Sequence, residues 1–312
     1  MIALQDIAIL TEKRYLNPKR VDWYIRNIIS EDLLVQSELE RLGFSCERVA
    51  WDNKFDPSKF RFALFRTTWN YFEKLDLFLS FLTRCAKKTS FINPYRQIKW
   101  SLDKRYLLWL KDRGVNIPPT HLVKKRGGVD LLSLCAEKGW NEIVIKPCVS
   151  AAAWNTHYIK KVEYQTQVLF DSLIKTQDML IQVFQKNIIT WGEVSIMMIN
   201  GKFSHAVLKN AKDGDFRVQD DFGGTVSAYE PKKSEVKFAK TVIGALPFSP
   251  VYARVDLVKD NNNNLALSEL ELIEPEMWFR LNPPAARQLA VTVEQFIRQS
   301  NKPWNHSPQH NK

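Results

Sequence analysis

The sequence of 312 residues predicts an α/β fold that is α+β in part. Strand and helix patterns alternate over the first hundred residues, which is typical of a parallel sheet covered by helices. Further on, Asn200-Gly201 separates two apolar runs, the strongest short signal for an antiparallel hairpin. A second pair of apolar runs flanks the asparagines at 261–264. We therefore expect an N-terminal parallel α/β domain, a small central α+β domain and a C-terminal antiparallel-sheet domain.

Apolar periodicity defines the elements of the first unit. A stripe of leucines between residues 33 and 42 predicts an amphipathic helix, with Ser30 as its N-terminal cap and Gly43 at its end. The expected strands are 6–10, 46–51, 62–66 and 90–92, and a further helix is expected at 75–85.

The other two units follow by the same reasoning. For the central unit we expect helices at 102–113, 129–138 and 168–175 and strands at 121–123, 142–146, 156–159 and 179–184. For the third we expect strands at 193–199, 202–208, 252–258 and 265–273 and helices at 235–245 and 285–300. A polar loop at 212–224 is expected between the strand at 202–208 and the helix at 235–245. The expected boundaries are 1–96, 97–183 and 184–305, with a polar tail at 306–312.

Composition narrows the class of protein. Hydrophobic residues make up 45% and charged residues 25% of the chain, as in ordinary soluble globular proteins. No apolar run reaches the length of a membrane span, the N-terminus lacks the pattern of a secretory signal, and the four cysteines show no C-x-x-C spacing. We expect a cytoplasmic protein with no membrane partner.

The formal net charge of +11 has two interpretations. It favours either a polyanion such as nucleic acid or small anionic ligands such as nucleotides and carboxylates. Because no basic stripe interleaved with aromatic residues is present, we expect no nucleic-acid partner.

The acidic hairpin at 254–275 is the most informative segment. Pairing of its two runs around Asn262–Asn263 sets Asp256 opposite Glu269, and Glu271 points to the same face because side chains two apart share a face. Three ionised carboxylates so close repel one another unless a divalent cation lies among them, and oxygen ligands suit Mg²⁺. A solvated acidic strand face is the alternative.

Basic residues elsewhere have equally plain alternatives. Lys146 leaves an apolar strand beside a small-residue loop, where its ammonium can lie over a phosphate, but the same loop fits a packing turn. Arg217 offers a planar fork for phosphate or carboxylate, or is part of a surface loop. Lys104 is a solvated lysine on local evidence alone.

Taken in order, these segments resemble the ATP-grasp superfamily of carboxylate–amine ligases over nearly the whole chain. The resemblance is to the branch with glutathione synthetase-like and ribosomal-protein glutamate ligases and the cyclase that forms D-cycloserine. The landmarks are R-T-T-W-N-Y at 66–71, N-P at 93–94, W-S-L-D-K-R-Y-L at 100–107, I-K-P-C-V-S-A at 145–151, Q-V-F at 182–184, G-E-V-S at 192–195, S-H-A-V-L-K at 204–209, G-D-F-R-V-Q-D-D-F-G-G at 214–224, R-V-D at 254–256 and E-L-E-L-I-E-P at 269–275.

The resemblance implies a role for each matching residue. For ATP, it implies binding by Lys104, Lys146, Ser150, Gln182, Val183, Phe184, Asn187 and Glu193. For the chemistry, it implies that Arg217, Lys146 and Lys209 stabilise the transferred phosphoryl group and the acyl-phosphate. For Mg²⁺ or Mn²⁺, it implies ligation by Asp256, Glu269 and Glu271. For substrate, it implies contact with Arg66, Thr67 and Trp69.

The implied function is ATP-dependent ligation of a small-molecule carboxylate to an amine, with the substrates and the oligomeric state left open. Two departures from the family pattern favour a second hypothesis, a catalytically silent ATP-binding module. Asn187 stands where relatives have an acidic residue for the ribose, and Ala151–Ala153 where they often have glycines. A third hypothesis is that the basic charge attracts a large acidic partner, such as a protein tail that accepts an amino acid.

Overall fold

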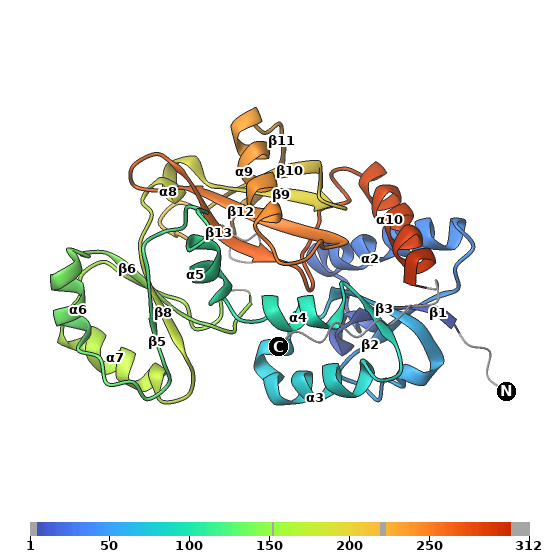
Figure 1. Ribbon diagram of the computed structural model, residues 1–312, viewed down its shortest axis with the longest axis horizontal. Coiled ribbons are helices and arrows are strands. Elements are labelled where there is room, and N and C mark those ends of the chain that lie inside the picture. Colours follow the sequence, from blue (N-terminus) through green and yellow to red (C-terminus); the bar gives the residue numbers. More distant parts are fainter. Residues whose placement is uncertain (1–4, 152, 219–222, 301–312) are drawn as a thin grey trace, which may run out of the picture.

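The computed structural model describes residues 5–151, 153–218 and 223–300. Its sheets form three units, with the central unit set to one side of the other two (Figure 1). The expected tail at 306–312, the last residues of the third predicted unit (301–305) and residue 152 of the alanine loop lie outside this range.

The N-terminal sheet is parallel, with strand order β2-β1-β3-β4. Its strands are β1 (Gln5–Thr11), β2 (Cys46–Ala50), β3 (Phe60–Thr67) and β4 (Ser90–Ile92). Its helices are α1 (Lys13–Leu16), α2 (Trp23–Arg41), α3 (Leu75–Cys85), α4 (Tyr95–Ser101) and the 3₁₀ turns Pro57–Lys59 and Tyr71–Lys74.

The expected start of α2 is wrong. Asp22 caps the helix by accepting the backbone N–H of Ile25 at 2.8 Å, so Ser30 lies inside it. Ile28 is buried in line with Val35 and Leu39, so the buried face begins before Leu33, the first of the leucines that defined the stripe in the sequence.

The central unit is an antiparallel sheet with helices packed on it. Its strand order is β5-β8-β6-β7. Its elements are β5 (Thr120–Val123), α6 (Leu131–Lys138), β6 (Ile143–Pro147), β7 (His157–Ile159), α7 (Tyr164–Ile174) and β8 (Met179–Val183), and helix α5 (Tyr106–Lys111) precedes them.

The C-terminal sheet is antiparallel, with order β11-β10-β9-β12-β13. Its elements are α8 (Asn187–Trp191), β9 (Glu193–Ile199), β10 (Lys202–Asn210), β11 (Thr225–Tyr229), α9 (Lys233–Gly244), β12 (Tyr252–Lys259), β13 (Leu265–Glu271) and α10 (Pro284–Ser300). The expected hairpin at Asn200-Gly201 is confirmed, and both residues have the positive φ that a tight turn there requires (51° and 69°).

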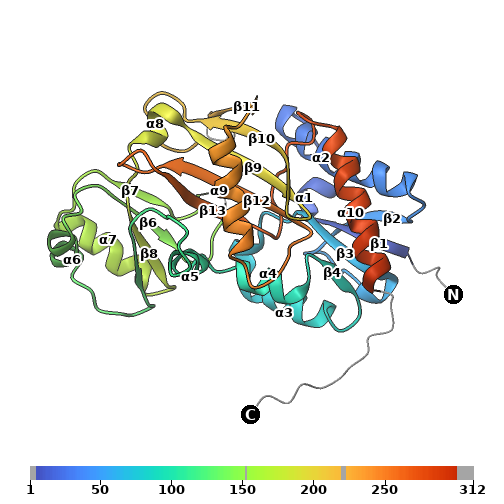
Figure 2. The same cartoon turned by 45° about the horizontal axis from the view of Figure 1, so that its top comes forward.

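One hydrophobic core joins the first and last parts of the chain. Ile9 and Leu64 of the N-terminal sheet pack in the same cluster as Met197 of β9 and Val293 of α10. Both views show α10 beside α2 (Figures 1 and 2). The N-terminal sheet and the C-terminal sheet are therefore fixed to each other.

Within the described residues, no helix combines the length and the apolar character needed to cross a membrane.

Candidate active site

A cavity of about 500 Å³ opens where the three sheets meet. Side chains from all three units line it. Thirteen of the residues singled out from the sequence are on its wall: Trp69, Lys104, Lys146, Ser150, Gln182, Val183, Phe184, Glu193, Lys209, Arg217, Asp256, Glu269 and Glu271.

The acidic hairpin forms one side of this cavity. Asp256 of β12 is in register with Glu269 of β13, as the turn position and the strand period predicted. Asp256, Glu269 and Glu271 each offer a carboxylate oxygen, and these oxygens lie within 4.8 Å of one another. The hairpin thus gathers three oxygen donors at one point, the ligand type that Mg²⁺ prefers.

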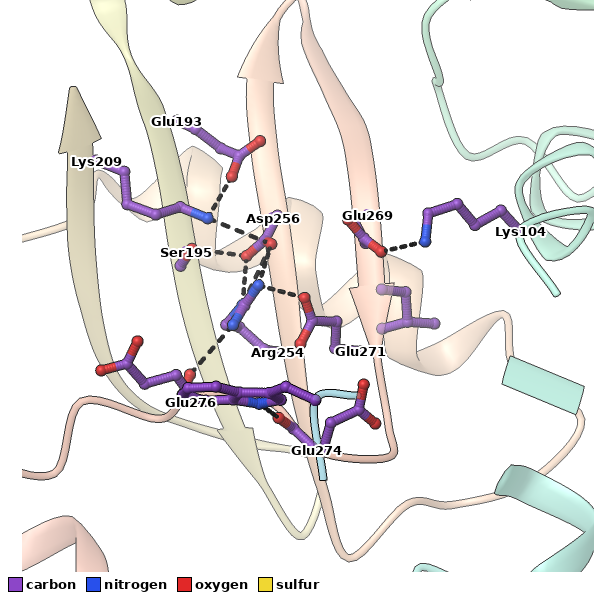
Figure 3. A network of polar contacts seen from close by, with 12 residues as sticks. Lys104, Glu193, Ser195, Lys209, Arg254, Asp256, Glu269, Glu271, Glu274 and Glu276 are labelled. Carbon is purple, nitrogen blue, oxygen red and sulfur yellow. Dashed lines mark hydrogen bonds and ion pairs between the residues drawn. The ribbon is translucent and has the colours of Figure 1, made fainter. Parts of the chain in front are cut away.

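Arg254 also neutralises this cluster. Its guanidinium donates to Asp256 at 2.9 and 2.8 Å and also pairs with Glu271 (Figure 3). Burial acts to raise the pKa of Asp256, but Arg254 and Lys209 outweigh it and hold the pKa at about 2. For Glu271, burial is the stronger effect and raises the pKa to about 7. The expectation that only a divalent cation relieves the repulsion was therefore incomplete.

Lys209 and Glu193 extend the charged network along the sheet. The Lys209 ammonium pairs with Glu193 and lies 3.4 Å from Asp256, which also accepts a hydrogen bond from Ser195 at 2.6 Å (Figure 3). Burial lowers the pKa of Lys209, but the carboxylates of Asp256 and Glu193 reverse this and raise it. Lys209 therefore stays charged at the base of the cavity.

Two further lysines approach from the opposite side. Lys104 lies in the turn between α4 and α5, two residues before α5 begins at Tyr106, rather than in the helix expected at 102–113. Its ammonium lies 2.8 Å from Glu269 and donates to the Ser150 carbonyl at 2.5 Å. Lys146, in β6, has no ion-pair partner among the described residues, and burial lowers its pKa to about 8. Lys146 is the cation here that remains available to a ligand.

An aromatic end of the cavity lies beside the strand end at β8. Phe184 stacks on Tyr158 with ring centroids 4.0 Å apart, and Phe216 packs edge-on to Phe184 at 6.2 Å. The Gln182 side chain donates to Thr120 at 2.8 Å, and the N–H groups of Val183 and Phe184 are taken by carbonyls of the protein. This end suits a flat ring.

Arg217 reaches the cavity from the polar loop after β10. Its guanidinium forms a fork with Asp215, with a closest approach of 2.7 Å, and Asp215 has a pKa well below its usual range because of this bond. The side chain of Arg217 is 37% exposed, so the guanidinium is accessible from the cavity.

Three candidates from the sequence lie away from the cavity wall that the described residues form. Asn187 donates to the backbone carbonyl of Asp260 at 2.6 Å in the turn of the acidic hairpin. Arg66 is fully buried against Glu31 at 3.4 Å, and the Thr67 hydroxyl donates to Asp32 at 2.9 Å. Arg66 and Thr67 end strand β3, but both side chains are buried in the interior rather than on the cavity wall.

Several residues of the site, among them Arg254 and Glu274, were not assigned a role from the sequence. Arg254 was identifiable, because it lies two positions before Asp256 on the same strand and therefore on the same face. Glu274 follows the end of β13 and lines the cavity at 5% exposure. Its position depends on how the chain leaves the sheet, which has no periodic signal.

Comparison with known families defines the class of protein. Residues 106–266 match the model of the prokaryotic glutathione synthetase ATP-grasp domain, and the chain belongs to this ATP-grasp family. Residues 7–93 match the model of the N-terminal domain of D-cycloserine synthetase DcsG.

Individual relatives agree with this assignment. The cycloserine biosynthesis protein DcsG of Streptomyces lavendulae is 27% identical over 272 residues, which cover 82% of this chain and 90% of that protein. The crystal structure of D-cycloserine synthetase DcsG superimposes with a TM-score of 0.81 at 24% identity, covering 93% and 99% of the two chains. The crystal structure of D-alanine–D-alanine ligase from Bacillus anthracis complexed with ATP superimposes with a TM-score of 0.62 at 14% identity, covering 96% of this chain and 100% of that chain.

The resemblance to ATP-grasp proteins and the expected fold class are thereby confirmed. The chain is homologous to the DcsG synthetase and to ATP-grasp ligases, a family that uses ATP and Mg²⁺.

Proposed function

We propose that this protein is an ATP-dependent carboxylate–amine ligase that works through an acyl-phosphate. The observation that carries the proposal is the meeting of two lysines and three carboxylates in one cavity of an ATP-grasp protein. ATP phosphorylates a substrate carboxylate, and an amine then displaces phosphate to form a C–N bond. The reaction needs positioning and charge neutralisation more than a protein nucleophile.

In this proposal the nucleotide spans the cavity. Phe184 and Phe216 flank the adenine, beside Gln182 and Val183. Lys146, which lacks an ion pair among the described residues, takes the phosphates, and Lys104 and the Ser150 loop cover them. Glu193 orients Lys209 through their ion pair.

The donor set fits a magnesium or manganese ion. Asp256, Glu269 and Glu271 would hold it, since their oxygens lie within 4.8 Å of one another. When bound, the ion offsets the charge of the phosphates. Arg254 anchors two of these carboxylates and keeps them in place.

Arg217 and Lys209 stabilise the phosphoryl group in transfer. Arg217 lines the cavity, and in this proposal its planar guanidinium binds phosphate oxygens in place of the Asp215 carboxylate with which it now pairs. Lys209 is held charged by Asp256 and Glu193. Trp69 would contact substrate. Arg66 and Thr67, which are buried behind the cavity wall, would support the loop that carries Trp69.

The substrates in this proposal are a small-molecule carboxylate and an amine. The relative named for D-cycloserine synthesis supports a small-molecule substrate. We place the activity in the cytoplasm, where ATP and Mg²⁺ are supplied.

Release of ADP that depends on an acid and an amine tests the proposal. Lys146→Ala removes the unpaired ammonium and Asp256→Asn removes the central carboxylate charge, so each should abolish ADP release across a panel of acids and amines. Lys124→Ala, an exposed lysine of the same central unit, is the matched control and should keep wild-type turnover. Full turnover in both site variants would contradict the assignment.

The second candidate is a catalytically silent ATP-binding module. It is favoured by Asn187, whose amide is engaged with Asp260 and lies off the cavity wall of the described residues. Calorimetry with ATP and Mg²⁺ distinguishes the two: tight binding without ADP release across the whole panel would favour the silent module.

A further inference from the structure

Glu274 is an unusual feature of the cavity wall. Its side chain is 5% exposed, yet its carboxylate has no hydrogen-bond or ion-pair partner in the part of the chain that the structure describes, and Oε2 is buried. A buried carboxylate without a partner is costly in free energy, because nothing replaces the water it has lost. Burial accordingly raises the pKa of Glu274 well above its usual range.

The two cations of the site whose charges act on Glu274, Lys104 and Arg254, are already engaged elsewhere. Lys104 pairs with Glu269 and with the Ser150 carbonyl, and Arg254 pairs with Asp256 and Glu271. Figure 3 shows Glu274 beyond Glu271, at the edge of this network and without a contact to it. Neither of these two cations therefore neutralises Glu274 through a direct contact within the described residues.

The surroundings of Glu274 identify the kind of cation. The Trp69 indole donates to the Glu274 backbone carbonyl at 2.9 Å, and Tyr15 packs edge-on to Trp69 at 6.0 Å. Both aromatic residues line the cavity. The Arg14 guanidinium lies over the Tyr15 ring at 4.7 Å, which leaves Trp69 as an aromatic contact beside the carboxylate. An aromatic ring next to a carboxylate suits an organic ammonium, which combines charge-assisted hydrogen bonds with a contact to the ring. A bound ammonium also favours the ionised form of Glu274, which burial disfavours in the free protein, whereas an anionic substrate carboxylate does not.

We propose that Glu274 anchors the ammonium group of the amine-bearing substrate, at the end of the cavity lined by Trp69 and Tyr15. This inference rests on the proposed ligase function. It assigns the amine-bearing substrate to the end of the cavity at Glu274 and the phosphates to the end at Lys146. Glu274 is thereby a specificity-determining residue that favours acceptors with a primary ammonium.

Methylammonium is the probe for this subsite. The Trp69 indole N–H, assigned with Trp69→Phe, is followed by ¹H–¹⁵N NMR of the full-length protein during titration with methylammonium chloride. The wild type should show a saturable shift, and potassium chloride or sodium chloride at equal ionic strength should not reproduce it. Glu274→Gln, a neutral isostere, should raise the midpoint roughly 10- to 100-fold, as expected for the loss of one charge-assisted bond.

Glu73→Gln is the matched control, because Glu73 also lines the cavity but is exposed. It should keep the wild-type midpoint, and Glu274→Asp should retain most of the response. A midpoint that Glu274→Gln leaves unchanged, a shift that simple salts reproduce, or no saturable shift in the wild type would overturn the inference.

ATP binding by wild type and Glu274→Gln is measured by calorimetry on the same samples. It should be equal in the two proteins, which also shows that the variant is folded. Failure of ATP to bind the wild type would count against the ligase proposal, whereas intact ATP binding with a Glu274-independent response would count against this inference alone.

Discussion

At the scale of single residues, Lys146 makes the nucleotide site sensitive to pH. Its pKa is lowered to about 8 by burial, so in the free protein the ammonium loses its proton as pH rises through 8. Bound phosphates favour the charged form and raise this pKa. ATP binding is therefore strongest below pH 8, and calorimetry should find the Kd for ATP increased up to about tenfold at pH 9.

Lys146→Arg is the control for this effect, because a guanidinium stays charged throughout the range. Its affinity for ATP should be flat between pH 7 and 9. If the wild type were equally flat, Lys146 would not be the group that meets the phosphates.

How far the sequence defines this site depends on how each side chain is positioned. Asp256 and Glu269 were correctly set opposite each other, because strand period and a short turn fix register. Arg66 and Thr67 followed the right strand but face the interior, since the pattern of a strand buried on both faces does not say which way its last residues turn. The roles assigned to individual residues stay predictions.

At the scale of elements, the turn of the acidic hairpin is hydrogen-bonded to the segment that leads from the central unit into the C-terminal sheet. Asn261 accepts the Lys186 N–H at 2.9 Å and donates to the Phe184 carbonyl at 2.9 Å. Asn187 donates to Asp260 in the same turn. The run of asparagines therefore holds the strand end beside the aromatic part of the cavity.

Asn261→Ala should weaken this attachment of the hairpin turn to the segment at 184–187. It removes two hydrogen bonds, a loss of about 1–2 kcal/mol in local stability, and should speed amide hydrogen exchange at residues 184–187 and weaken ATP binding. Asn262→Ala is the control, since the Asn262 side chain makes no hydrogen bond within the described residues. Equal amide hydrogen exchange in the two variants would argue against this attachment.

The elements that were missed are short or depend on distant contacts. Helices α4 and α8 have seven and five residues, too few for a periodic signal. Strand β11 has an exposed, weakly apolar pattern and exists because it pairs with β10. Long periodic helices such as α3 and α10 were predicted close to their observed bounds.

At the scale of the whole molecule, nucleotide and metal should stabilise the fold together. The phosphates meet lysines of the central unit and the carboxylates belong to the C-terminal sheet, so a bound Mg²⁺–ATP links the two units. At 100 times its Kd, Mg²⁺–ATP should raise the free energy of unfolding by about 2.7 kcal/mol and Tm by roughly 5 °C.

Differential scanning calorimetry tests this linkage. ATP with EDTA should give a smaller shift than ATP with Mg²⁺, and Asp256→Asn should make the two equal. A full shift in EDTA would mean that the carboxylates do not take part in nucleotide binding.

The order of the three sheets was predicted from the sequence, but the way they pack was not. Local periodicity identifies each sheet, whereas the core shared by Ile9, Leu64 and Val293 joins residues almost three hundred positions apart. The domain boundaries at 96/97 and 183/184 stay a prediction.

This shared core has a consequence for synthesis. The strands of the N-terminal sheet leave the ribosome long before Val293 and Ile297 of α10, which complete their apolar cluster with α2. While the central unit and the C-terminal sheet are being synthesised, the nascent chain therefore carries an apolar face that is covered only once α10 has emerged.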